Sequence, residues 1–383
     1  EIVNSVSLVV PVVGYKIESG TASMSRDNSW KDFIPENAPW YKMYFHNQEH
    51  MNYLASDGGS HIVVSVKEEA ESKLYRLIIR SKDGNNFHTV TTERFAFTDW
   101  RENYEEIIWT VEPKLREMEA EFVPLDKPGL QQAFINYETR DMRLTKKFKF
   151  GIVLCKKGQT KEEEMFTNQQ GSADYTDFLN IAGKTIDMSK NFSGYTGGLS
   201  LEKETGQYSV YALWRDFEVM YHVSTMLPQS DDNAQQVHKK RHIGNDIVVV
   251  IFQEAGSLPF HPTTVKSNYI QIQIVVRAIR DPKLPRKGPP YYHVSVVNQS
   301  DVPEYGPPLP YPPIFRHDDK FKDWLMEKLV NSELAAYRSK LFVQQLRSTY
   351  RALIKDFVQN FAPDEKVMRK LRKDRKKKDD KKR

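Results

Sequence analysis

Basic side chains and one carboxamide gather near the middle of the chain, immediately before an apolar run. The segment from Lys239 to Asp246 reads KKRHIGND, and Ile247–Phe252 (IVVVIF) follows at once. An unbroken apolar run of this kind is typical of a buried strand. Polar side chains on such rigid support, with several cations among them, suit a site that binds phosphate.

A helix is predicted ahead of this strand, over residues 234–245, with a capping box offered by Asn233 and Gln236. Gly244 near its end permits the close approach of another backbone segment. The residues that would share one face of this helix, at offsets of three, four and seven, are His238, Arg241, His242 and Asn245.

Three chemistries fit this helix poorly. His238 and His242 have the i, i+4 spacing of a zinc-protease helix, but Lys239 stands where that motif needs a glutamate base. No nucleophilic Ser, Cys or Thr lies in the motif, and the chain has no P-loop pattern G-x-x-x-x-G-K-S/T. We therefore expect no bound metal and no nucleotide held by this chain itself.

What remains is action on a phosphate that another protein holds. A carboxamide can accept a hydrogen bond from water while donating one to a phosphate oxygen, and a glutamine orients the attacking water in GTP hydrolysis in this way. Asn245 could therefore act in trans. The residues alone leave a structural alternative open, in which Asn245 caps the helix and Lys239–Arg241 form a solvated face.

The composition indicates a globular protein of about two domains. The chain has 383 residues, of which 39% are hydrophobic. The apolar run Val6–Val13 is far shorter than the roughly 20 residues that span a bilayer, and it lacks the features of a signal peptide, so we expect a cytoplasmic protein. Cys155 lies in a strand-like apolar segment and is expected to be a buried structural thiol.

The formal net charge of +5 comes from the end of the chain. Residues 366–383 hold twelve Lys and Arg against three Asp, a net of +9, which leaves −4 for the rest. No aromatic residue is interleaved with these charges to stack on bases, so no nucleic-acid partner is expected. Residues 363–383 are predicted to be a disordered basic tail, with weak contact to an anionic membrane or nuclear targeting as the alternative.

For the first part of the chain, the sequence predicts a lead segment over residues 1–40, with one strand at Val9–Tyr15. A small α+β domain is predicted over residues 41–144. The elements expected in that domain are paired strands at His61–Lys67 and Leu74–Arg80, a helix from Tyr104 that ends before Pro113, and a strand at Phe134–Thr139.

Residues 145–362 predict an α/β domain whose mixed sheet is flanked by helices. The expected elements are a strand at Phe150–Cys155, a capping box at Thr160 and Glu163, a helix from Ser172 to Gly183, a hairpin around Arg215-Asp216, strands ending in Tyr292–Val297, and two amphipathic helices near Trp324 and Leu346. The proline-rich segment Gly306–Pro313 is expected to pack on its own domain, with docking to an SH3-type groove as the alternative.

Several of these segments together resemble the Rap GTPase-activating protein family, the Rap/Ran-GAP domain. Its central motif, KRHIGND followed by an apolar strand and FQ, stands unbroken from Lys240 to Gln253. The resemblance covers about residues 148–345, and His46–Asp57 resembles the preceding region, which can mediate dimerisation in the family. The other matching segments are Phe148–Gly151, Lys157–Phe166, His222–Pro228 and Asp301–Pro310.

The resemblance implies acceleration of GTP hydrolysis on a Rap-type small GTPase by an asparagine thumb, and Asn245 is the matching residue. GTP and magnesium would be held by that partner. The residues that would support the thumb or meet the GTPase are Arg241, His242, Lys240, Gly244 and Lys149. Two alternatives stay open: a non-catalytic module that binds a small GTPase, and an activator of a Ral- or Rheb-type GTPase. Either way the chain would be an activator of an enzyme rather than a stand-alone enzyme.

Overall fold

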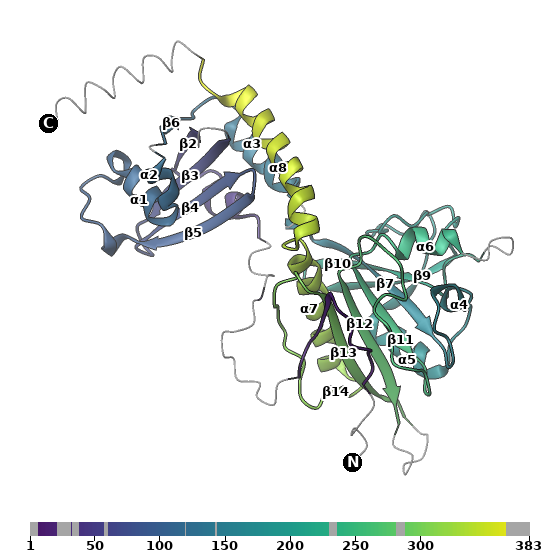
Figure 1. Cartoon of the computed structure of the whole chain (residues 1–383). Coiled ribbons are helices and arrows are strands. Elements are labelled where there is room, and N and C mark those ends of the chain that lie inside the picture. The colour runs from purple at the N-terminus through teal and green to yellow at the C-terminus, as the bar shows by residue number, and fades with distance from the viewer. Residues whose placement is uncertain are drawn as a thin grey trace. The chain divides into compact units, whose positions relative to one another are not determined.

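The structure is a computed structural model, and it describes residues 7–20, 32, 38–56, 60–118, 120–141, 144–229, 236–280 and 288–364. The described residues form two compact units (Figure 1). One unit contains those up to residue 36 together with residues 145–340, and the other contains residues 37–144 together with those from 341 onward. The predicted basic tail lies outside the described residues, apart from its first two positions.

The first unit is built on a nine-stranded mixed sheet, which confirms the predicted α/β class. Its central strands β12, β11, β7 and β10 are parallel, and its flanking pairs are antiparallel. In spatial order the strands are β1 (Tyr15–Ile17), β13 (Tyr291–Gln299), β12 (Ile272–Ile279), β11 (Val248–Gln253), β7 (Lys147–Cys155), β10 (Phe217–Val223), β9 (Tyr208–Trp214) and β8 (Lys184–Asp187), and β14 (Ile314–Phe315) pairs with β13.

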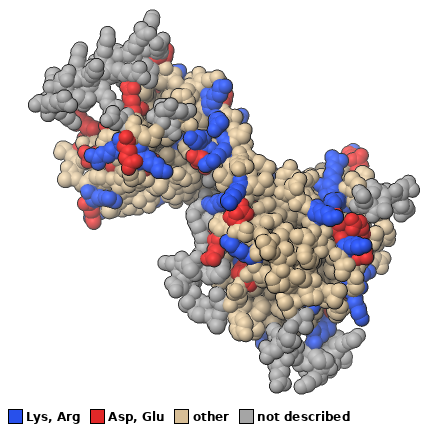
Figure 2. Space-filling model, in the orientation of Figure 1, with Lys and Arg blue, Asp and Glu red and all other residues tan. Residues whose placement is uncertain are grey.

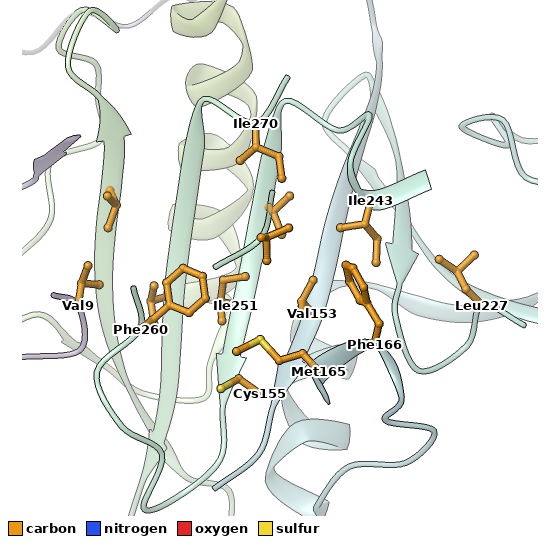
Figure 3. Packing of buried hydrophobic residues seen from close by; sticks show 14 of the residues in the cluster. Val9, Val153, Cys155, Met165, Phe166, Leu227, Ile243, Ile251, Phe260 and Ile270 are labelled. Carbon is orange, nitrogen blue, oxygen red and sulfur yellow. The ribbon is translucent and has the colours of Figure 1, made fainter. Parts of the chain in front are cut away.

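Helices cover both faces of this sheet, so all six residues of β11 are buried. On one face, Phe166 and Ile243 pack against Val153 and Ile251 (Figure 3). On the other, the Phe178 ring packs against the Phe252 ring, with 5.3 Å between the ring centroids. The helices of the first face are α4 (Glu162–Phe166) and α6 (Val237–Ile243), and those of the second are α5 (Ala173–Ala182) and α7 (Asp319–Ala336).

The second unit is a five-stranded antiparallel sheet with a core on each face. In spatial order its strands are β5 (Gly84–Thr91), β4 (Leu74–Ser81), β3 (His61–Glu69), β2 (Met51–Ser56) and β6 (Val123–Pro124). The helices α1 (Tyr104–Val111) and α2 (Pro113–Glu117) contribute to one core. A π-helical turn (Tyr41–Phe45), α3 (Leu130–Thr139) and α8 (Lys340–Phe361) contribute to the other.

The predicted domain limits were wrong at both ends. Residues assigned to a lead segment instead provide β1, which pairs antiparallel with β13 through Tyr15 and Gln299; the strand expected at Val9–Tyr15 reduces to a single bridge from Val9 to Phe260. The predicted α/β domain was expected to reach residue 362, but Phe357 of α8 packs on Phe134 of the antiparallel unit at 4.7 Å.

Several local predictions also need correction. Phe134–Thr139 is helical, because Leu130, Phe134 and Tyr137 fall on one buried face of α3. The capping box lies one residue later than expected: the Glu164 carboxylate accepts from the backbone amides of residues 160 and 161. The helix that begins after Ser172 does end at Gly183, yet that glycine is extended (φ 177°), not left-handed.

Two smaller predictions are confirmed. Cys155 is buried, and burial raises the pKa of its thiol to about 11, so it is not a reactive thiolate. The proline-rich segment packs on its own unit, where the Pro308 carbonyl accepts from the Trp324 indole and Leu309 is 2% exposed. In the part of the chain that the structure describes, no helix is both long and apolar enough to cross a membrane.

Candidate functional site

Helix α6 is shorter than predicted and carries the basic motif at its C-terminal end. It ends at Ile243, with Gly244 as C-cap; the predicted start at Ala234 and the capping residue Asn233 lie outside the described residues. The Gly244 amide donates to the Lys240 carbonyl (2.8 Å), and a Cβ on Gly244 would lie 2.6 Å from that oxygen. A side chain at position 244 would therefore push the backbone out of this tight turn.

The two adjacent lysines of α6 point inward, towards α4. Lys239 is fully buried, and its ammonium donates to the carbonyls of Phe166 (2.7 Å) and Asn168 (3.4 Å). Burial lowers the pKa of Lys239 to about 8. Lys240 forms an ion pair with Glu162 at 2.5 Å. The alternative of a solvated face over Lys239–Arg241 is therefore wrong for Lys239, and Lys240 has a partner within the chain.

His238, Arg241 and Asn245 are exposed, as their predicted common face requires. His242 departs from that face, because it is half-buried and its ring lies 5.3 Å from the ring of His222. Burial, helped by His222 and Arg241, lowers the pKa of His242 to about 4. The ring is thus neutral near pH 7 and adds no positive charge to the site.

The Asn245 carboxamide is exposed and is held by its own helix. Its Nδ2 donates to the Arg241 carbonyl at 2.7 Å. The opposite orientation would place Oδ1 against a carbonyl oxygen, so the hydrogen-bond pattern sets which atom is the donor. Among the described residues Oδ1 receives no hydrogen bond, and the second Nδ2 hydrogen is also available. The capping alternative is thus correct as a description of one contact, and it leaves an acceptor and a donor facing solvent.

Asp246, which sequence reasoning missed, fixes the chain directly after Asn245. It is fully buried, accepts from His222 Nδ1 at 2.9 Å, and lies 3.8 Å from the Lys149 ammonium. Gly151 of β7 packs against Asp246, because a Cβ added at Gly151 would lie 3.2 Å from the Asp246 carboxylate. Lys149, expected to meet a partner, is therefore paired inside the chain, with 35% of its side chain exposed.

A second buried carboxyl group, Glu333 of α7, belongs to the same cluster. Burial raises the pKa of Glu333 to about 8, and the nearby Asp246 charge adds to the rise. The Tyr337 hydroxyl donates to Oε1 at 2.7 Å, while Oε2 has no hydrogen-bond partner in the described structure. The signals that could have identified this cluster are an aspartate just before the buried strand and a histidine in the strand of the predicted hairpin.

The surface around α6 carries both signs of charge. On the face drawn in Figure 2, basic and acidic side chains are interspersed in the region of α6 and α4, not gathered into one basic patch. Within the described ranges, no group of three or more His, Cys, Asp or Glu is placed to hold a metal ion. Fold and site together define an α/β domain that presents one uncharged carboxamide at the end of a short basic helix.

Comparison with known proteins gives this domain its family. Residues 165–351, which include all of α6 and Asn245, match the family model described as Rap/ran-GAP. The human "GTPase-activating Rap/Ran-GAP domain-like protein 3" is 34% identical over 376 residues, covering 91% of this chain and 35% of the relative. The human "Signal-induced proliferation-associated 1-like protein 3" is 32% identical over 345 residues, covering 86% of this chain and 19% of the relative.

The chain belongs to the Rap/Ran-GAP family, which confirms the resemblance found in the sequence. It spans about a third of the length of the first relative and about a fifth of the second. A solved structure described as "Structure of the TSC2 GAP domain" is 29% identical, covers 53% of this chain and 99% of its own, and superposes with a TM-score of 0.42. Arg241, His242 and Asn245 lie within the family match, whereas Lys149 precedes it.

Proposed function

We propose that this chain is a GTPase-activating protein, and that it stimulates a Rap-type small GTPase by inserting the Asn245 carboxamide in trans. The observation that carries the proposal is the placement of Asn245: an exposed amide with a free acceptor and a free donor, between the end of a short helix and the start of a fully buried strand. Membership of the Rap/Ran-GAP family, and the relative named as GTPase-activating, support this activity.

The chemistry required is the positioning of one water molecule against a phosphorus atom. Oδ1 of Asn245 would accept from the water, while the second Nδ2 hydrogen donates to a phosphate oxygen or to the GTPase. The first hydrogen stays on the Arg241 carbonyl and keeps the amide plane oriented. The partner would supply GTP and magnesium, so the activator needs no cofactor of its own.

The residues around Asn245 take graded roles in this proposal. Arg241 is exposed on the same side and is available to the GTPase, while neutral His242 packs behind it and supports the helix. Gly244 allows the tight turn. Lys240 and Lys149 already have partners in the chain, so we assign them to support of the site and only secondarily to contact with an acidic partner.

Three further features belong to the proposal. Residues 41–144 resemble the region that can mediate dimerisation in the family, which favours a homodimer. A cytoplasmic location fits a regulator of small GTPases. Weak membrane contact through the basic tail concerns residues that the structure does not describe.

The test is single-turnover hydrolysis of GTP bound to a purified Rap GTPase, with and without the chain. Activation in trans reaches about 10⁵-fold in small GTPases, and Asn245→Ala should remove most of it while complex formation stays measurable. A matched control is Asn360→Ala, because Asn360 makes the same i to i−4 contact, from Nδ2 to the Asp356 carbonyl at 2.9 Å, at the end of α8. That variant should keep full activity.

Two results would contradict the proposal. If the wild-type chain binds Rap without accelerating hydrolysis, it is a non-catalytic binding module. If Asn245→Ala loses binding in proportion to rate, the amide is a contact residue and not a thumb. A panel that includes Ral and Rheb GTPases tests the remaining alternative, an activator with a different substrate.

A further inference from the structure

Helix α6 is too short to be stable by itself. It has seven residues, and its N-cap Gln236 makes no side-chain cap and has a positive φ of 47°. Isolated helices of fewer than about 12–15 residues are marginal in water. Tertiary contacts must therefore set the position of its last turn, from which Asn245 projects.

One buried carboxylate on α4 holds two separate parts of the site. Glu162 is 3% exposed. Its Oε1 accepts from the Lys240 ammonium of α6 at 2.5 Å, and its Oε2 accepts from the backbone amide of Lys266 at 2.9 Å. Glu162 thus links α6 to the loop between β11 and β12.

Ser267, the next residue of that loop, contacts the C-terminal end of α6. The Ser267 hydroxyl donates to the Gly244 carbonyl at 2.5 Å, and its oxygen accepts from the Tyr269 amide at 2.9 Å. The Gly244 carbonyl and the Asn245 amide belong to the same planar peptide group. A bond that fixes this carbonyl therefore fixes the direction in which the chain enters Asn245.

These contacts close a ring of hydrogen bonds around the last turn of α6. It runs from Lys240 to Glu162, through the Lys266 amide to Ser267, and back to Gly244, four residues after its start. The last carbonyls of a helix lack intrahelical partners, and here the loop supplies one. Helix and loop are thereby held as one body at the point where Asn245 leaves the helix.

We propose that Glu162 and Ser267 are positioning residues, which hold the Asn245 carboxamide in its productive orientation without touching the GTPase. This inference rests on the proposed function. Catalytic groups must be held to within about 0.5 Å, and a misplacement of about 1 Å can cost about 10²-fold in rate. Loosening the ring should therefore lower kcat more than it weakens binding.

The experiment compares graded variants of the full chain in single-turnover GTP hydrolysis on Rap, with Rap binding measured in parallel. Ser267→Ala should lower the maximal stimulated rate about tenfold with the Kd for Rap changed by less than about twofold, and Ser267→Thr, which keeps the hydroxyl, should restore most of the rate. Glu162→Ala should lower the rate by at least as much, and Glu162→Gln by less, because an amide still offers one acceptor oxygen.

Matched controls come from neighbouring positions. Glu163→Gln removes the same charge from the same turn of α4, and Thr264→Ala removes a hydroxyl from the same loop; neither side chain joins the ring. Both should keep the wild-type rate. Amide hydrogen exchange gives a readout that needs no GTPase: the amides of Gly244 and Asn245 should exchange faster in Ser267→Ala and at the wild-type rate in Thr264→Ala.

A double-mutant comparison separates positioning of Asn245 from general support of the fold. In the Asn245→Ala background, Ser267→Ala should change the residual rate by less than about twofold, because the group that it positions is already gone. An equal loss in both backgrounds would overturn the proposal, as would unchanged rate and exchange in Ser267→Ala. If the wild-type chain does not accelerate hydrolysis, the proposed function fails, whereas the exchange result still tests the ring.

Discussion

Each unit of the molecule has a cluster of buried ionisable side chains, and the two clusters differ in the sign of the charges that face each other. In the antiparallel unit, Arg80 is 1% exposed, donates to the Ser65 hydroxyl at 2.9 Å, and lies over the Phe134 ring at 4.1 Å. Burial lowers the pKa of Arg80 to about 10, and the negative charge of Glu138 opposes that change. Glu138 itself accepts from the Tyr41 amide at 2.6 Å. Charges of opposite sign support each other here.

In the mixed-sheet unit, two carboxyl groups, those of Asp246 and Glu333, lie in one buried cluster. Asp246 helps to raise the pKa of Glu333, and Lys149 only partly offsets this. Both clusters contain buried atoms without a hydrogen bond in the described structure: Oδ1 of Asp246 and Oε2 of Glu333 here, and Nε and Nη2 of Arg80 in the other unit. Buried groups of like sign with perturbed pKa values are typical of functional sites. One cluster therefore stabilises its sheet through opposite charges. In the other, Asp246 and Glu333 repel each other when both are ionised, and Asp246 directly follows Asn245.

The largest effect on stability should come from breaking the cluster of Arg80 and Glu138. Arg80→Met leaves Glu138 buried without its opposing charge, and should lower the free energy of unfolding by about 3–5 kcal/mol. Urea denaturation of the full chain measures this. Arg347→Met, which breaks the exposed pair with Asp83, is the control and should cost about 1 kcal/mol or less. Equal losses in the two variants would show that Arg80 is not compensated as described.

An intermediate effect should come from the cluster of Asp246 and Glu333, and it should depend on pH. The pKa of Glu333 rises from 4.5 to about 8 on folding, so the folded chain keeps a proton that the unfolded chain releases. The free energy of unfolding should therefore fall as pH rises from 4.5 to 8. Glu333→Gln removes this loss and should stabilise the protein by on the order of a few kcal/mol at pH 8, and much less at pH 5.

Urea denaturation at pH 5, 7 and 8.5 follows that prediction, with Glu163→Gln as the control that should show no such pH dependence. A Glu333→Gln effect that is the same at all three pH values would mean that the carboxyl is ionised in the fold, and the contrast between the two clusters would then weaken.

The smallest effect concerns His242. Its pKa is lowered from 6.5 to about 4, so the unfolded chain takes up a proton below pH 6.5 that the folded chain refuses. Stability should fall as pH drops from 6.5 to 4, by less than the Glu333 effect, and the NMR signals of the His242 ring should not shift between pH 5.5 and 8. An inflection near pH 6.5 would show that the ring is solvated and charged in the site.

The parts of the fold that the sequence predicted are those with a local signal. The apolar runs of β7 and β11, the hairpin of β9 and β10, and the helix after Ser172 were each visible in a window of a few residues, since burial on both faces or a cap leaves a pattern there. The proposed role of Asn245 rests on a local signal of the same kind, its own motif.

What sequence reasoning missed depends on partners far away along the chain. Nothing near Lys239 distinguishes it from Lys240, yet carbonyls more than seventy positions earlier bury its ammonium. The packing of Phe134 against Phe357, which comes from the other end of the chain, also leaves no local signal. Asp246 lies just before β11 and Glu333 lies in α7. Because they are far apart along the chain, no local spacing predicts that they come together.

The interleaving of the two units has a consequence for the order in which the protein is made. The antiparallel sheet leaves the ribosome early, but Phe357, which completes its second core, follows only after the whole mixed-sheet unit. At about 5–20 residues per second, a gap of roughly 200 residues means a wait on the order of 10 to 40 seconds. During that time the face beneath α8 is an exposed apolar surface, so nascent chains paused before residue 341 should be bound by chaperones more readily than those paused after residue 361.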